Sequence, residues 1–123
     1  MNKKINETKI PLLLLVKYNK KYTVYSPYTF GMETWGANYQ RGIEKKRKNW
    51  YITHWIGGDE YHEDRYGEIK LNVVLETSST SAVLKEIKKK DIKQLDRIKL
   101  EIKEILNDWK ILKLWLKRKN IYE

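Results

Sequence analysis

Cysteine is absent from this chain of 123 residues, which excludes disulfide bonds, thiolate catalysis and cysteine-based zinc sites. Alanine is nearly absent as well and occurs only at Ala37 and Ala82. A long hydrophobic run is also missing: the apolar segment Pro11–Val16 has six residues, whereas a membrane-spanning helix needs about 20. This segment is not followed by the small-residue cleavage site of a secretory signal. We therefore expect a cytoplasmic protein that does not bind membranes.

Positive charge dominates the polar residues. Lysine and arginine number 26 against 16 aspartates and glutamates, which gives a formal net charge of +10. Residues 1–48 carry 11 basic and 3 acidic side chains, and residues 79–123 carry 13 and 7, whereas residues 49–78 carry 2 and 6. Such a balance favours a polyanionic partner such as nucleic acid, although it also serves solubility alone.

Four segments in residues 10–76 have the pattern of β-strands. Ile10–Val16 is apolar throughout, as expected of a strand that is buried on both faces. Tyr22–Tyr25 follows it after a polar turn, so the two form a candidate hairpin. Trp50–Ile56 is rich in aromatic and β-branched residues, and Glu68–Leu75 alternates between apolar and polar positions. We expect these four to form an antiparallel sheet, interrupted by a long basic loop over residues 27–48.

The last third of the chain has the spacing of apolar residues that is typical of amphipathic helices. Serines and threonines at positions 77–81 are candidate N-caps, and Asp91 with Gln94 resembles a capping box. We predict either two helices, Thr80–Lys89 and Ile92–Lys119, or one helix bent near Lys90. The fold class is therefore α+β in a single domain, 1–123: about four antiparallel strands followed by one long C-terminal helical segment, 80–119.

The second part of this helical segment is too long for the expected sheet to cover. Residues 92–119 would span roughly 40 Å at 1.5 Å per residue, whereas a compact chain of this size is about 35 Å across. We therefore expect the helix to pair with a second copy in a homodimer or to dock on a partner; the alternative is that residues 27–48 fold over it. The interaction residues would be the apolar seam Leu95, Ile98, Ile102, Ile105, Trp109, Leu112 and Leu116, with Leu106, Ile111 and Trp115 beside it.

A cluster of histidines and carboxylates lies in the sequence HWIGGDEYHED, residues 54–64. Imidazole and carboxylate groups suit a divalent cation, but their spacing matches no standard metal motif. Glu68-Ile69-Lys70 resembles the E-x-K element of restriction-type nucleases, so a metal-dependent nuclease is one alternative, with His54, Asp59, His62, Glu68 and Lys70 as its residues. No nucleophile with a neighbouring base is visible. We therefore expect no enzymatic activity, no metal, no cofactor and no small-molecule substrate.

The strongest functional signal is the mixture of basic and aromatic residues in the first 51 positions. Cationic side chains follow the phosphates of single-stranded nucleic acid, and aromatic rings stack on its bases. We therefore predict a small non-enzymatic protein that binds single-stranded DNA or RNA, or a nucleoprotein. The candidate phosphate contacts are Lys20, Lys21, Arg41, Lys45, Lys46, Arg47 and Lys48, and the candidate stacking residues are Tyr28, Trp35 and Tyr39.

A second interpretation is an accessory protein of a virus or mobile element. The many lysines, isoleucines and leucines fit the AT-rich codons of such a genome. In the host cytoplasm, such a protein would bind and inhibit a host complex, as anti-CRISPR inhibitors do. Its anchors would be the apolar residues of the C-terminal helix, Leu106, Ile111, Leu114 and Trp115, because buried aromatic and aliphatic anchors dominate many interfaces.

Overall fold

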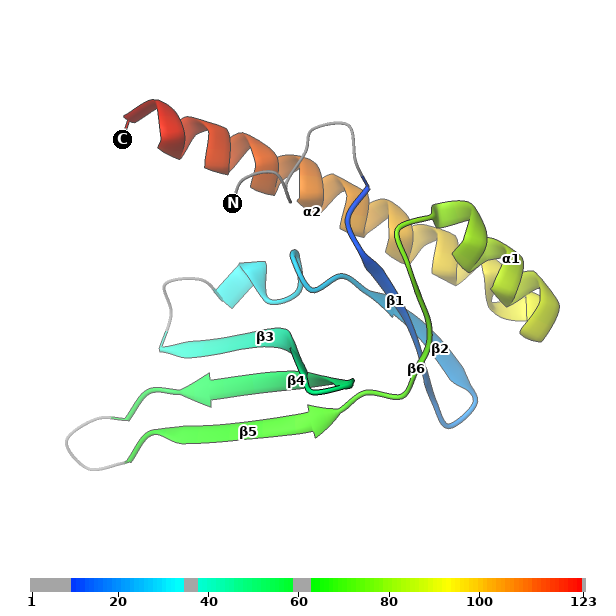
Figure 1. Ribbon diagram of the computed structural model, residues 1–123, viewed down its shortest axis with the longest axis horizontal. Coiled ribbons are helices and arrows are strands. Elements are labelled where there is room, and N and C mark those ends of the chain that lie inside the picture. Colours follow the sequence, from blue (N-terminus) through cyan, green and yellow to red (C-terminus); the bar gives the residue numbers. More distant parts are fainter. Residues whose placement is uncertain (1–9, 35–37, 59–62, 123) are drawn as a thin grey trace.

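The computed structural model describes residues 10–34, 38–58 and 63–122, and of residues 119–122 only the backbone. The described strands form two three-stranded antiparallel sheets (Figure 1). The first sheet has the order β2-β1-β6, made of β1 (Leu13–Tyr18), β2 (Lys21–Tyr25) and β6 (Val73–Thr77). The second has the order β3-β4-β5, made of β3 (Tyr39–Lys46), β4 (Asn49–Ile56) and β5 (Arg65–Lys70).

Two helices follow the strands, α1 (Thr80–Lys90) and α2 (Leu95–Tyr122), with the short 3-10 turn η3 (Ile92–Gln94) between them. A further 3-10 turn, η2 (Met32–Thr34), precedes β3. The predicted α+β class, with antiparallel strands and a long C-terminal helical segment, is confirmed. No helix in the described part of the chain is long and apolar enough to cross a membrane.

Strand β1 is the centre of the fold, because both of its faces are buried. Leu13 and Leu15 pack with the helices, whereas Leu14 and Val16 pack against the second sheet. All four are at most 5% exposed. The apolar run of the sequence thus forms a strand that is buried on both faces, as predicted. The first sheet lies between the helices and the second sheet and is the middle of three layers.

The β1–β2 hairpin matches the expectation from the sequence. Asn19 has the left-handed backbone conformation of a tight turn, with φ of 54°, which asparagine tolerates better than most residues. Tyr22 and Tyr25 point to opposite faces of β2. Tyr22 lies in the core under the helices, whereas Tyr25 meets the ring of Phe30 edge-on, with 5.3 Å between ring centroids.

The predicted number of strands is wrong, since the described part of the chain has six. Residues 27–48, expected to be a loop, contain β3, which pairs with β4 along its whole length. The strand was hard to detect because Ile43 is its only buried residue. Its other side chains are long and mostly polar, so the apolar alternation that identifies a strand is missing. The basic run Arg41–Lys48 is therefore a strand and a tight turn.

The predicted strand Glu68–Leu75 is in fact two strands that belong to different sheets. β5 ends at Lys70 and β6 begins at Val73. Leu71 donates a backbone hydrogen bond to Trp50 of the second sheet, whereas Asn72 accepts one from Lys17 of the first. The alternation continues across this junction because Leu71 is buried there, at 9% exposure, so the pattern alone does not reveal the change of sheet.

The helical segment is two helices, as one of the two alternatives predicted. Ser79 is the N-cap of α1, and its hydroxyl accepts a hydrogen bond from the amide of Ala82 at 3.2 Å. Gln94, the last residue of η3, does not form a standard capping box with Asp91. It accepts a hydrogen bond from the amide of Tyr22 and donates one to the carbonyl of Lys20, both at 2.8 Å. The helix junction is thereby fixed to the β1–β2 hairpin.

Most of the α2 seam is buried inside the chain itself. Ile98, Ile102, Ile105, Trp109 and Leu112 are at most 8% exposed. The first three pack on the first sheet, and Tyr28 from the expected loop lies on Trp109, with 5.4 Å between ring centroids. These five residues are therefore already covered without a second copy. Among the described side chains of α2, the exposed apolar ones are instead Leu100, Ile111, Leu114 and Trp115, at 61%, 50%, 67% and 48%.

Candidate nucleic-acid interface

The second sheet has an inner and an outer face. Its inner face turns toward the first sheet and η2, because Ile43 and Ile52 pack into the core between the sheets. Strand alternation and the register of β3, β4 and β5 then define the outer face. The outer face carries Gln40, Gly42, Glu44 and Lys46 from β3, Asn49, Tyr51, Thr53 and Trp55 from β4, and Tyr66, Glu68 and Lys70 from β5.

Aromatic rings from two neighbouring strands lie on this outer face. Trp55 and Tyr66 are direct cross-strand partners, so their Cβ atoms are about 5 Å apart. Tyr51 lies four residues before Trp55 on the same strand. Tyr66 is 59% exposed, and Tyr51 and Trp55 are half-buried. The first sheet packs on the opposite, inner face through Leu14 and Val16, so the three rings lie on the face that points away from the core.

Lys46 is held over this aromatic surface by two neighbours on β5. Its ammonium lies 2.5 Å from a carboxylate oxygen of Glu68 and donates a hydrogen bond to the Tyr66 hydroxyl at 2.9 Å. The hydrogen bond to Glu68, followed by that to Tyr66, raises the pKa of Lys46. The same bond from Lys46 lowers the pKa of Glu68. Lys46 and Glu68 therefore both stay charged at neutral pH and neutralise each other.

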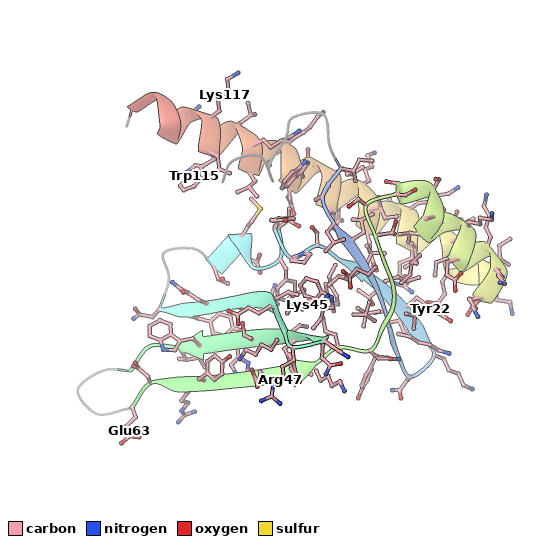
Figure 2. The ribbon with its side chains drawn as sticks, viewed as in Figure 1. Tyr22, Lys45, Arg47, Glu63, Trp115 and Lys117 are labelled. Carbon is pink, nitrogen blue, oxygen red and sulfur yellow. The ribbon has the colours of Figure 1, made fainter. Side chains whose placement is uncertain are left out.

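Three other cations at the end of the outer face have no carboxylate partner within the described chain: Arg47, Lys48 and Lys70. Arg47 and Lys48 form the tight turn between β3 and β4, where Arg47 has φ of 60°. Lys48 and Lys70 border an open groove of about 580 Å³ that runs between Trp50 and β6. Figure 2 shows Arg47 beside the second sheet, on the side away from α2.

The structure separates the predicted phosphate contacts of β3. Lys46 lies on the outer face, but Arg41 and Lys45 are on the inner face. Arg41 forms an ion pair with Glu33 and lies over the ring of Phe30, 4.7 Å from its centroid. Glu33 has a lowered pKa, through a backbone hydrogen bond and then the bond from Arg41. Much of the positive charge of Arg41 is therefore balanced locally.

Lys45 connects the two sheets. Its ammonium lies 5.6 Å from the centre of the Trp50 ring and 3.9 Å from a carboxylate oxygen of Glu76. The Trp50 indole donates a hydrogen bond to the other Glu76 oxygen at 2.9 Å. In Figure 2, Lys45 lies between the second sheet and β6. Lys45 is therefore a contact between β3, β4 and β6 rather than a free cation.

The remaining predicted residues are also separated. Lys20 and Lys21 are exposed at the β1–β2 turn, in the first sheet. Tyr28 packs on Trp109 and Tyr39 lies on the inner face, 40% exposed. Trp35 lies outside the described residues. The predicted set thus does not form one continuous surface.

The residues considered for metal or nuclease chemistry are not brought together where they are described. His54 is on the inner face of β4, with its ring against Gly67. Glu68 bonds Lys46, and Asp59 and His62 lie outside the described residues. Within residues 10–34, 38–58 and 63–122, no group of three histidines or carboxylates is arranged to hold a metal ion.

Four residues of the outer face were not among the predicted nucleic-acid contacts: Tyr51, Trp55, Tyr66 and Lys70, the last of which was considered only for nuclease chemistry. Alternation in β4 could have identified Tyr51 and Trp55 as one face, because Thr53 lies between them. Tyr66 and Lys70 alternate in the same way on β5. Their shared surface depends on the register between the strands, which the sequence pattern does not reveal.

Comparisons of this chain with protein-family models, with curated proteins and with solved structures find no match.

Proposed function

We propose that this protein binds single-stranded nucleic acid on the outer face of the second sheet. The observation that supports this proposal is the set of three aromatic side chains on an exposed sheet face, with cations at one end of it that pair with no carboxylate among the described residues. No enzymatic activity is part of the proposal. The surface differs from the one expected from sequence, because only Lys46, Arg47 and Lys48 of the predicted residues belong to it.

Stacking on Trp55, Tyr66 and Tyr51 would supply the contacts to bases. An exposed antiparallel sheet with aromatic residues is a common platform for unpaired bases, because the rings stand out from a rigid surface. Each stacked base contributes about 1–3 kcal/mol and requires little sequence preference. Duplex nucleic acid would bind less well, since its bases are already stacked on one another.

The cations at the end of the face would supply the phosphate contacts. Arg47, Lys48 and Lys70 carry charge that no carboxylate of the described chain balances. Glu44 and Glu68 on the same face offset part of this charge, and Lys46 is already paired with Glu68. We therefore expect modest affinity with a strong dependence on salt.

Fluorescence titration with an unlabelled oligothymidylate at low salt tests the proposal, because Trp55 should be quenched on stacking. The logarithm of the binding constant should fall linearly with that of the salt concentration, by about 0.7 per phosphate neutralised. Tyr66→Ala should weaken binding by about fivefold or more, the lower end of the stacking range. Lys70→Ala should reduce the slope of this salt dependence by about 0.7, the contribution of one neutralised phosphate.

Tyr39→Ala is the matched control for Tyr66→Ala. Both tyrosines are exposed residues of the second sheet, at 40% and 59%, but they lie on opposite faces. Tyr39→Ala should therefore leave the affinity unchanged. Equal losses in both variants, or no binding of any oligonucleotide at low salt, would refute the proposed surface.

A protein-interaction module, such as an anti-CRISPR-like inhibitor, is the second candidate. It is supported by the apolar side chains of Ile111, Leu114 and Trp115, which are about half exposed or more near the end of α2. Trp115 points to the side of α2 on which the second sheet lies (Figure 2). The double variant Ile111→Glu with Leu114→Glu would abolish binding of the partner protein and leave oligonucleotide binding intact. This result separates the protein-interaction function from the nucleic-acid function.

A further inference from the structure

The first sheet protects both of its edge strands. At β2, the backbone amides of Tyr22 and Val24 donate hydrogen bonds to the side chains of Gln94 and Glu101, at 2.8 and 2.9 Å. At β6, a bulge interrupts the register with β1 and breaks the regular row of backbone groups. Both are known means of preventing an edge strand from pairing with another chain.

The second sheet protects only one of its edges. At β3, Gly31 packs directly against the backbone carbonyl of Arg41, whose side chain bonds Glu33 of η2. β5 pairs with β4 along its whole length without a bulge, and no other described strand pairs with its opposite side. Figure 1 shows β5 at the rim of the molecule, with β4 on one side of it. β5 is therefore a regular edge strand that the described part of the chain leaves open.

The open backbone groups of β5 can be identified. The amide of Leu71 donates a hydrogen bond to the carbonyl of Trp50 at 2.8 Å. Residues that bond the neighbouring strand alternate in an antiparallel ladder. The amides and carbonyls of Tyr66, Glu68 and Lys70 therefore point away from β4, toward the free edge.

The free edge has opposite charges at its two ends. Glu63 and Asp64 precede the strand and Lys70 ends it. Figure 2 shows Glu63 near the start of β5 and Arg47 toward its other end. A second β5 strand in antiparallel orientation would place the acidic start of one copy beside the basic end of the other. The edge is thus complementary in charge to a second copy of itself.

We propose that two copies of this protein bound to one nucleic-acid strand pair through their β5 edges. The proposal rests on the nucleic-acid function, because pairing of two short strands is marginal in water, whereas copies on one strand meet at an effective concentration of order millimolar. A twofold axis perpendicular to the sheet keeps both outer faces on the same side. Trp55 and Tyr66 of the second copy therefore extend the aromatic surface across one continuous sheet.

Charge selects the register of this pairing. With Gly67 of both copies opposite each other, Tyr66 lies opposite Glu68 of the second copy, and Lys70 lies opposite Asp64 of the second copy. A shift by two residues in either direction would place Glu68 opposite the second copy's Glu68 or Asp64, where like charges repel. The register centred on Gly67 is therefore favoured.

The same register covers exposed apolar surface on the inner face. Ile69 is 59% exposed, although it lies on the face that carries the core residue Ile52. It would lie opposite Arg65 of the second copy, whose aliphatic carbons can pack on it. Ile69 and Arg65 do not belong to the outer face, so they report on the pairing and not on base or phosphate contacts.

Fluorescence titration with a short and a long oligothymidylate tests the pairing. One small fold covers about 4–16 nucleotides of a single strand, so an oligonucleotide of about 8 nucleotides holds one copy and one of about 24 holds two. The affinity per copy should be at least about fivefold higher on the long one, because its two copies are held together. The double variant Ile111→Glu with Leu114→Glu should show the same gain, which separates this contact from association through α2.

Charge changes at the edge locate the contact. Ile69→Lys should remove the gain on the long oligonucleotide, because the introduced lysine faces Arg65 of the second copy. Adding Arg65→Glu to this variant should restore the gain. Val74→Lys is the matched control, since Val74 is an exposed apolar residue of the edge strand β6, and it should keep the gain. Binding of the short oligonucleotide should be unchanged by Ile69→Lys.

Disulfide cross-linking tests the register, and the absence of native cysteine makes it unambiguous. Directly opposite residues that do not bond each other have Cα atoms about 4.5 Å apart, within the range that a disulfide spans. A mixture of Arg65→Cys and Ile69→Cys proteins should therefore cross-link on the long oligonucleotide, whereas either variant alone should not.

The outcomes separate the pairing from the nucleic-acid function. Binding of the short oligonucleotide with no gain on the long one, or a gain that survives Ile69→Lys, would overturn the β5 pairing and leave the proposed function standing. Equal cross-linking of the mixture and the single variants would overturn the register and with it the proposal. No binding of either oligonucleotide would refute the proposed function and this contact together.

Discussion

Gly31 holds the segment before β3 against that strand, and its replacement by alanine tests this part of the fold. Gly31 has φ of 81°, a left-handed conformation that side chains rarely adopt. A Cβ atom there would overlap the carbonyl oxygen of Arg41 and lie 3.2 Å from its Cγ. The same strand holds Arg41 over Phe30 and next to Glu33. Gly31→Ala must therefore push η2 away from β3.

The magnitude follows from two costs. Placing a residue with a Cβ in the left-handed region costs about 1–2 kcal/mol. The overlap with backbone atoms adds to this, because a carbonyl in a paired strand cannot move like a flexible side chain. We expect Gly31→Ala to lower the free energy of unfolding by at least about 2 kcal/mol, which corresponds to a shift of about 1 M or more in the urea midpoint.

Gly42→Ala is the matched control. Gly42 lies on β3 as well, but the nearest atom to its added Cβ would be the Thr53 hydroxyl oxygen at 3.8 Å, an ordinary contact. Alanine reduces the freedom of the unfolded chain, so this variant should be neutral or more stable by up to about 1 kcal/mol. Urea denaturation followed by far-ultraviolet circular dichroism compares the two. Equal stabilities of Gly31→Ala and Gly42→Ala would refute the reasoning.

Two further predictions concern charge and assembly. Because Lys46 lowers the pKa of Glu68, the stability that Glu68 contributes is present above its ordinary pKa of 4.5 and is lost as the pH falls through the lowered value. Denaturation from pH 7 to acid pH should therefore show the stability difference between wild type and Glu68→Gln begin to shrink near pH 4.5 and vanish below the lowered pKa of Glu68; a difference that persists at still lower pH would contradict this. We expect a homodimer to form through the helical turn of α2 that exposes Ile111 and Leu114, because the apolar seam of α2 is already buried within the chain. Leu114→Glu should therefore reduce the mass measured by light scattering to that of a monomer. A dimer that survives the change, or a monomeric wild type, would contradict this prediction.

Elements with strong local patterns could be predicted from the sequence. The apolar run around Leu13–Val16 indicated a strand buried on both faces, and β1 is such a strand. The serines before α1 indicated a helix start, and Ser79 caps it. The apolar seam indicated α2 itself. In each case the signal lies within a few neighbouring residues and reflects a local requirement of backbone or burial.

Features that depend on pairing between distant segments could not be predicted. β3 has only one buried side chain, so its strand character comes from hydrogen bonds to β4 rather than from its own pattern. The change of sheet at Leu71 leaves the apolar alternation intact. The outer face of the second sheet was missed for the same reason, since register decides whether Tyr66 stands beside Trp55. The contact by which Tyr28 covers Trp109 could not be predicted either, because the two residues lie far apart in the sequence and meet only in the folded chain.

The order of strands has a consequence for synthesis on the ribosome. β3, β4 and β5 form a meander of consecutive hairpins, which can pair as soon as residue 70 has emerged. β1, in contrast, pairs with β6, which follows the whole meander in the sequence. The face of β1 that carries Leu13 and Leu15 is covered by α1 and α2, which follow β6. A nascent chain thus displays Leu13, Leu15 and Tyr22 uncovered until α1 and α2, residues 80–122, have been synthesised, and a product truncated before α2 should aggregate rather than persist as a smaller native domain.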